Sequence, residues 1–247
     1  MELPELTAAM KLARELVPPF VSAFLRIAPV CLAAPFFGGE AAPVVLRLAL
    51  AVGAAGAATT FVAPAPGSVF VDTSIGIILA ITSLFVFRAM EMAGRWLDVA
   101  RGAQHVETLI PELSSRSSPL GTAFHLFTLA VFASIDGHAR VFECLVAAAG
   151  IGSTANTALQ SGLIGVSSAL TKILSVAFGL VAPGFAALLL VDLGISWIAR
   201  MIPGLQTYLL SFGLKAWLGI FFLAMTLEPL ARGVVRLLEV AGGIYSP

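Results

Sequence analysis

Residues 88–121 read RAMEMAGRWLDVARGAQHVETLIPELSSRSSPLG, and they form the one long polar stretch of a very apolar chain. Charges of alternating sign recur in the first half at spacings of three or four residues: Arg88, Glu91, Arg95 and Asp98. This spacing predicts a single charged stripe along one face of a helix. The second half contains Gly102, Pro111 and a serine-rich run, which is the composition of a loop. We therefore expect a charged helix that runs out of an apolar layer into a polar loop.

The composition is that of an integral membrane protein, or of a protein that buries nearly all of its surface against partners. Of 247 residues, 59% are hydrophobic and only 11% are charged, and the mean hydropathy is +0.99. In a typical soluble domain, roughly a quarter of the residues are charged. The net charge is zero, so the basic footprint of a nucleic-acid-binding protein is absent. The cysteines Cys31 and Cys144 lie in apolar runs, which indicates core thiols rather than a disulfide framework.

Long apolar stretches predict an all-α, multi-helix membrane fold. They are 17–37, 44–62, 69–87 leading into the charged stripe, 122–135 followed by 139–149, 163–198, and 205–227 with an amphipathic tail at 228–240. A helix over 69–101 would be about 50 Å long, whereas a bilayer core is about 30 Å thick. Stretch 163–198 is also too long for one span, and Pro183 within it permits a kinked helix or a helical hairpin. The polar, glycine-containing segment 150–162 indicates a second loop.

Small residues and one histidine allow more specific expectations. Ala49, Gly53 and Ala57 recur every four positions, which predicts a face for close helix packing. His138 follows Asp136 and Gly137, so we interpret it as a turn or cap residue rather than a proton-handling group.

Several cations lie inside apolar sequence. Arg26, Lys172 and Lys215 are expensive in lipid, so they should face protein, water or a partner subunit. Arg47 lies one turn into its stretch and fits either an interfacial anchor or a buried contact. If the chain crosses the membrane six times, neither side carries a clear excess of lysine and arginine, so charge does not set the orientation.

The order and spacing of short motifs resemble the FliR/SctT family, an export-apparatus subunit of flagellar and virulence type III secretion systems. The motifs are Arg26-Ile-Ala-Pro29, Pro35, Pro43-x-x-x-Arg47, Ala93-Gly94 through Asp98, Arg101-Gly102-Ala103, Ser117-Ser118-Pro119-Leu120-Gly121, Asp136-Gly137-His138, Ala182-Pro183, Asp192-Leu-Gly194, Arg200-x-x-Pro203 and Lys215. The Arg-Gly-Ala and Ser-Ser-Pro-Leu-Gly motifs look more similar to the virulence branch than to the flagellar one.

The resemblance implies a place in a larger assembly. A single copy would join FliP/SctR-like and FliQ/SctS-like subunits in a helical export complex in the bacterial inner membrane, with an FlhB/SctU-like protein at the cytoplasmic side. Residues 1–150 would be similar in fold to the first partner and 151–247 to the second, with long, kinked apolar helices partly raised out of the bilayer. Unfolded proteins would leave the cytoplasm through this channel. No catalytic residue, metal or cofactor is implied.

Two sets of candidate site residues follow. The resemblance implies that the polar loop lies in the pore and helps to close it; its candidate gate residues are Arg101, Gly102, Ala103, Pro111, Ser117, Ser118 and Pro119. Taken without the resemblance, the same stretch is better interpreted as a surface loop between helices. The candidate buried assembly charges are Arg26, Arg47, Lys172, Asp192 and Lys215.

Other function classes fit less well. A small-solute secondary transporter would use midplane groups at Arg26, Asp136, His138, Lys172 and Asp192, but the two halves of the chain show no repeated charge pattern. An intramembrane enzyme is not indicated, because the sequence has neither HExxH nor GxSxG.

Overall fold

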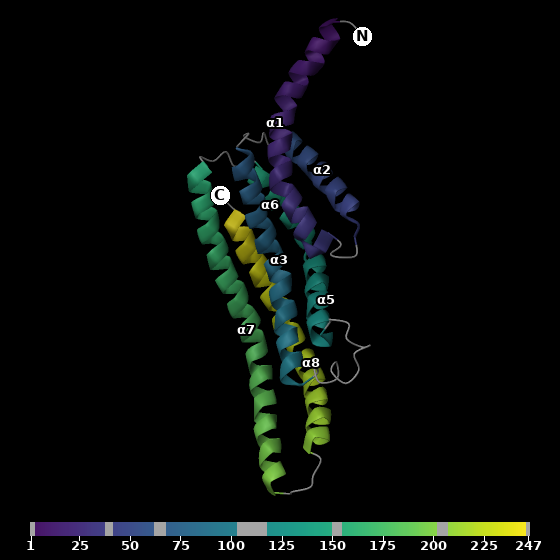
Figure 1. The fold of residues 1–247 in the computed structure, drawn as a ribbon, viewed down its shortest axis with the longest axis vertical. Coiled ribbons are helices and arrows are strands. Elements are labelled where there is room, and N and C mark those ends of the chain that lie inside the picture. The colour runs from purple at the N-terminus through teal and green to yellow at the C-terminus, as the bar shows by residue number, and fades with distance from the viewer. Residues whose placement is uncertain are drawn as a thin grey trace. The chain divides into compact units, whose positions relative to one another are not determined.

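The computed structural model describes residues 3–37, 42–61, 68–102, 118–149, 155–201 and 207–245. Within these ranges all regular structure is helical, which confirms the predicted all-α fold class. The α-helices are α1 (Leu3–Ala33), α2 (Val44–Phe61), α3 (Val69–Ala100), α5 (Pro119–Ser134), α6 (Gly137–Ala149), α7 (Ala155–Met201) and α8 (Thr207–Tyr245), and a 3-10 turn covers Pro35–Phe37 (Figure 1).

The predicted helix over 69–101 is confirmed as α3, and α2 matches its predicted stretch within one residue. Gly102 ends α3 as the sequence suggested. Its φ is 80°, a left-handed conformation that glycine adopts without steric cost, and its amide donates to the carbonyl of Val99 at 3.0 Å.

Two helices are longer than the sequence predicted. α1 begins at Leu3 rather than near Val17, because residues 3–16 are rich in leucine, alanine and other good helix formers. α7 is one continuous helix of 47 residues that contains Pro183, which decides against a hairpin. The predicted loop at 150–162 is wrong for 155–162, because lengthening an existing helix needs no new nucleation; residues 150–154 lie outside the described ranges.

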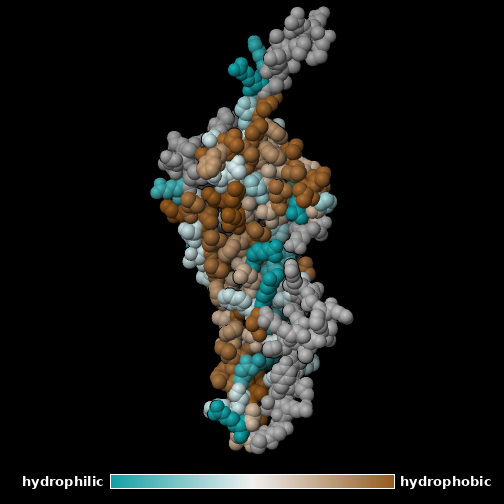
Figure 2. All heavy atoms as spheres, in the orientation of Figure 1, coloured by the Kyte–Doolittle hydropathy of each residue, from teal (hydrophilic) through white to brown (hydrophobic). Residues whose placement is uncertain are grey.

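Four helical segments in the described ranges are long and apolar enough to cross a membrane: Arg14–Ala33, Val69–Ala100, Gly162–Met201 and Gly213–Gly233. The bent pair Pro119–Ser134 and Gly137–Val146 makes up to five. This is fewer than the six crossings considered from the sequence, because α2 is a shorter apolar helix. Figure 2 shows that hydrophobic residues cover much of the face drawn. The chain is a multi-pass membrane protein.

Contacts divide the chain into two compact units. Unit 1 contains residues 1–85, 136–170 and 238–247, and unit 2 contains residues 86–135 and 171–237. The units are interleaved along the sequence, since α3, α7 and α8 each contribute to both. The predicted fold likeness of 1–150 to FliP/SctR and of 151–247 to FliQ/SctS is a separate matter and stays a prediction.

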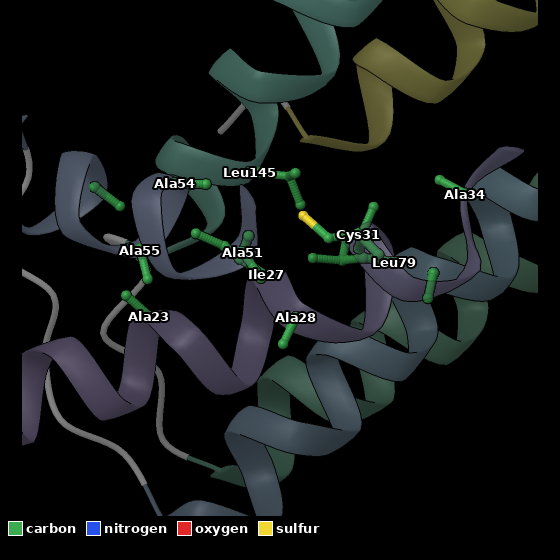
Figure 3. Packing of buried hydrophobic residues seen from close by; sticks show 13 residues of the cluster. Ala23, Ile27, Ala28, Cys31, Ala34, Ala51, Ala54, Ala55, Leu79 and Leu145 are labelled. Atoms are coloured by element: carbon green, nitrogen blue, oxygen red, sulfur yellow. The ribbon is translucent and has the colours of Figure 1, made fainter. Parts of the chain in front are cut away.

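The core of unit 1 is built from small side chains where α1, α2 and α6 meet (Figure 3). Ala23 and Ile27 of α1 and Ala51 and Ala55 of α2 are fully buried there. The alanines among them let two helix backbones approach closely.

The prediction that Ala49, Gly53 and Ala57 form the packing face of α2 is wrong for contacts within the chain. Ala49 and Gly53 are exposed, and a Cβ added at Gly53 would meet nothing within 4 Å. The buried residues of α2 are instead Ala51, Ala54, Ala55 and Ala58. Alanine occurs all round α2, so small residues alone do not identify the face that contacts α1.

Unit 2 has an aromatic core. Phe87 of α3 contacts Phe132 of α5 edge-on, with ring centroids 5.4 Å apart, and Phe124 is fully buried. Large apolar side chains of α7 and α8 remain exposed, among them Trp197 at 72% and Trp217 at 75%. Such exposure suits contact with lipid or with partner subunits rather than with water.

Candidate functional site

A buried ion pair joins α1 to α3 inside unit 1. Arg26 donates from Nε and from Nη2 to Oδ1 of Asp72, at 3.0 and 2.8 Å, and both side chains are almost completely buried. Gly76 lies one turn beyond Asp72, and a Cβ there would be 2.5 Å from the carbonyl oxygen of Leu25. The absence of a side chain at Gly76 therefore lets the α3 backbone approach α1 where the pair forms.

Sequence reasoning predicted burial for Arg26 but missed its partner Asp72. A usable signal existed, because Asp72 is the one acidic residue between Ala41 and Met90. An acid in apolar sequence is expensive unless it is paired, so it should have been matched with the nearest buried cation.

Arg47 of α2 reaches the end of α1. Its Nη1 donates to the carbonyl of Leu32 at 3.0 Å. Leu32 is in the last turn of α1, where carbonyl groups lack partners within the helix and the helix dipole favours a cation. Of the two interpretations left open by the sequence, the structure favours a partly buried contact, and this contact is within the chain.

The charged stripe of α3 forms only in part. Glu91 accepts from Arg88 at 2.8 Å and is also paired with Arg95, and both arginines are about half exposed. Asp98 does not belong to the stripe. Its side chain is buried and faces α5, so the prediction of one continuous stripe is wrong at its last member.

Asp98 connects the last turn of α3 to the first turn of α5. Its Oδ2 accepts hydrogen bonds from the hydroxyl of Ser118 and from the backbone amide of Leu120, the latter at 2.8 Å. Its Oδ1 lies 2.6 Å from Nη2 of Arg101, in the geometry of a charge pair rather than of an aligned hydrogen bond. Both described ends of the predicted polar loop thus meet at one carboxylate.

The start of α5 is built around Ser118. Its hydroxyl accepts from the amide of Gly121 at 3.0 Å, which makes it the N-cap, and Pro119 follows at the first helical position. Glycines close this junction: a Cβ at Gly94 would lie 2.5 Å from the carbonyl oxygen of Leu120, and one at Gly121 would lie 2.7 Å from Cγ of Arg95.

Lys215 of α8 binds two groups in unit 2. Its Nζ pairs with Asp192 of α7 and lies 3.4 Å from the carbonyl oxygen of Ala100, at the end of α3. Lys215 is 13% exposed and Asp192 is 43% exposed. Lys172 differs, because its side chain is exposed in the chain by itself. Its predicted burial in an assembly stays a prediction.

The remaining predicted residues fall into two groups. Arg101, Gly102, Ser118 and Pro119 are described above, whereas Ala103, Pro111 and Ser117 lie outside the described residues. His138 is exposed in the first turn of α6, and the carbonyl of Asp136 accepts from the amide of Ala139 at 3.0 Å. This position agrees with a turn or cap residue.

The arrangement stabilises charges inside apolar helices. Within the described ranges, no group of three or more histidines, cysteines and acidic residues could hold a metal ion. Arg26 pairs with Asp72, and Asp192 pairs with Lys215, two partners that the transporter hypothesis did not include. The site therefore joins helices to one another, and the transporter alternative is not favoured.

Comparison with known proteins identifies the family. The family described as bacterial export proteins, family 1, matches residues 17–241. The flagellar biosynthetic protein FliR of Bacillus subtilis is 22% identical over 214 residues, covering 81% of this chain and 83% of that protein. The Yop proteins translocation protein T of Yersinia pestis is 27% identical over 150 residues, covering 58% of this chain and 56% of that protein. The resemblance noted from the sequence motifs is confirmed, and the chain belongs to the bacterial export proteins, family 1.

Proposed function

We propose that this chain is a core subunit of a type III secretion export gate, part of the channel through which unfolded proteins leave the cytoplasm. The observation that carries the proposal is the family match over residues 17–241 in a chain whose described helices are long and apolar. The names of the similar proteins, one a flagellar biosynthetic protein and one a Yop translocation protein, support the same function.

The proposed partners are FliP/SctR-like, FliQ/SctS-like and FlhB/SctU-like subunits in the bacterial inner membrane. Exposed tryptophans on α7 and α8 support this, because aromatic residues are enriched in the buried centres of protein interfaces. Helix length supports it as well. At 47 residues α7 is about 70 Å long, more than twice the thickness of a bilayer core. In the proposed complex, part of it leaves the hydrocarbon layer.

The branch is proposed from motifs. Arg101-Gly102-Ala103 and the Ser117–Gly121 motif favour a virulence system over a flagellar one. The similar proteins include one from each branch, the flagellar protein matched over more of the chain and the Yop protein at higher identity.

The segment from Arg101 to Ser118 is the proposed gate. Its sequence is polar and contains Gly102, Pro111 and a serine-rich run. Irregular segments are tolerated at membrane depth where they line an aqueous cavity. The segment would obstruct the closed channel and move aside during export.

Assembly is tested by co-expressing the chain with the three candidate partners and purifying the products in mild detergent. A stable complex that contains the partners supports the proposal. A monomer or dimer that transports a small solute when reconstituted would support the transporter instead.

Gating is tested by shortening 104–115 in a complex that still assembles. We expect more ion and small-solute leakage across the membrane than with the parent complex. A shortened complex that assembles normally and stays as tight as the parent would count against a gating role.

A further inference from the structure

Asp98 combines features that a carboxylate needed only for local helix stability would not require. It is 3% exposed, and its two oxygens have different partners. Oδ2 accepts from Ser118 and Leu120 at the start of α5, and Oδ1 faces Arg101 just beyond the end of α3. Glu91, two turns earlier on α3, forms ion pairs with two arginines of its own helix, Arg88 and Arg95.

The electrostatics of both helix ends favour this arrangement. The first amides of a helix lack partners within it, and its N-terminus attracts negative charge. Asp98 therefore supplies a second cap to α5 from a neighbouring helix. The C-terminus of α3 attracts positive charge, and Arg101 and Lys215 lie there.

The surrounding packing leaves little room for α5 to shift against α3 while these contacts last. The glycines Gly94 and Gly121 bring the two backbones together. Arg101 also packs close to α8, where a Cβ at Gly219 would lie 3.1 Å from its Nη1. Moving α5 away from α3 would leave a buried carboxylate without its donors.

We propose that Asp98 is a positioning residue of the export subunit: one carboxylate holds the end of α3 and the start of α5 together and so fixes the spacing between Arg101 and Ser118. The contacts stand by themselves, and only the consequence for export rests on the proposed function. In the assembled complex, weakening this junction should let the end of α3 and the start of α5 shift against each other.

The spacing is measured by pulsed electron paramagnetic resonance on the full-length chain in detergent. Spin labels are attached at Val99→Cys and Leu126→Cys, two exposed positions on α3 and α5, in a background with Cys31→Ala and Cys144→Ser. We expect one narrow distance distribution when Asp98 is present. Asp98→Ala should broaden it or add a longer distance, and Asp98→Asn should do so less, because the amide oxygen can still accept from Leu120.

A charge-neutral pair separates a specific contact from general destabilisation. Arg101→Gln alone leaves the carboxylate without its cation and should broaden the distribution. Combining it with Asp98→Asn should restore part of the narrow distribution, because no charge is then left unpaired. Glu91→Gln is the matched control, since it removes a carboxylate with two arginine partners on the same helix; it should leave the distribution unchanged.

The functional readout is leakage through the assembled complex at equal complex yield. Losing the charge-assisted contact predicts a rise of roughly tenfold for Asp98→Asn, with no rise for Glu91→Gln. If Asp98→Ala and Asp98→Asn both keep the narrow distribution, the positioning role is wrong whatever happens to leakage. If no complex forms with the partners, the proposed function fails, while the distance measurement on the chain still decides the role of Asp98.

Discussion

Arg26 of α1 and Asp72 of α3 lie 46 positions apart in the sequence and form an almost fully buried ion pair, in which two guanidinium nitrogens share one carboxylate oxygen. The pair neutralises the charge that made α1 unusual for a membrane span. Arg47 and Lys215 likewise have partners within the chain, at Leu32, Ala100 and Asp192. Cations that suggested contacts with other subunits thus also stabilise this subunit.

Replacing one member of the buried pair should destabilise the chain far more than replacing both. Arg26→Leu leaves the Asp72 carboxylate unpaired in apolar surroundings, which should lower the free energy of unfolding by about 3–5 kcal/mol. The double variant Arg26→Leu with Asp72→Leu should recover most of this loss. Denaturant unfolding of the purified chain in mixed micelles measures both.

The control for that measurement is an exposed pair. Arg232 and Glu228 are paired on α8, and their side chains are 74% and 75% exposed. Removing this pair with Arg232→Gln should change stability by less than about 1 kcal/mol. If Arg26→Leu proved no worse than Arg232→Gln, the buried pair would have no special role.

Arg47 should stabilise the end of α1. Arg47→Gln removes a cation next to carbonyl groups that lack partners in the helix, and we expect a loss of about 0.5–1 kcal/mol. Arg140→Gln, at an exposed arginine of α6, is the matched substitution and should have a smaller effect. Amide hydrogen exchange in the last turn of α1 locates the change, since exchange there should accelerate only in Arg47→Gln.

Two lysines in apolar sequence should behave differently. Lys215→Met leaves Asp192 and the Ala100 carbonyl without their cation, so it should lower the thermal unfolding midpoint of the chain alone. Lys172→Met replaces an exposed lysine, so it should leave that midpoint unchanged and reduce the yield of the proposed complex. Equal effects of the two variants on the chain alone would contradict this distinction.

Replacing Gly76 and Gly53 by alanine should change the stability of the chain in opposite directions. A Cβ at Gly76 would lie 2.5 Å from the Leu25 carbonyl oxygen, so Gly76→Ala must push α1 and α3 apart and should destabilise the chain. Gly53→Ala meets no neighbour within 4 Å and removes a helix-interior glycine, so it should stabilise the chain by about 0.5–1 kcal/mol. Unfolding of the chain alone measures both signs.

The same Gly53 variant tests the face predicted from the sequence. If the spacing of Ala49, Gly53 and Ala57 serves a partner subunit, Gly53→Ala should stabilise the chain and yet lower the yield of complex. An unchanged yield would leave the face without a packing role in either setting.

The sequence by itself determined the features that depend on local pattern. Hydrophobic runs identified α2 and α3 and the helical, multi-pass character of the chain, because a residue's cost in lipid depends mainly on its own chemistry. Gly102 marked the end of α3, because the left-handed backbone conformation that ends many helices favours glycine. The motifs identified the family. Helix ends at Leu3 and Ala155 were missed, since extension of a helix depends on cooperativity rather than on hydrophobicity.

Only the tertiary structure decided which helix faces meet. Helical spacing placed Asp98 in a stripe with Glu91. In the structure Asp98 faces α5, whereas the described ion pairs of Glu91 are with arginines of its own helix. Many alanines of α2 were equivalent in the sequence, and contact with α1 selected Ala51, Ala55 and Ala58. Nothing local links Arg26 to Asp72, because periodicity fixes the face of a residue on its own helix but not the residue that lies opposite on another.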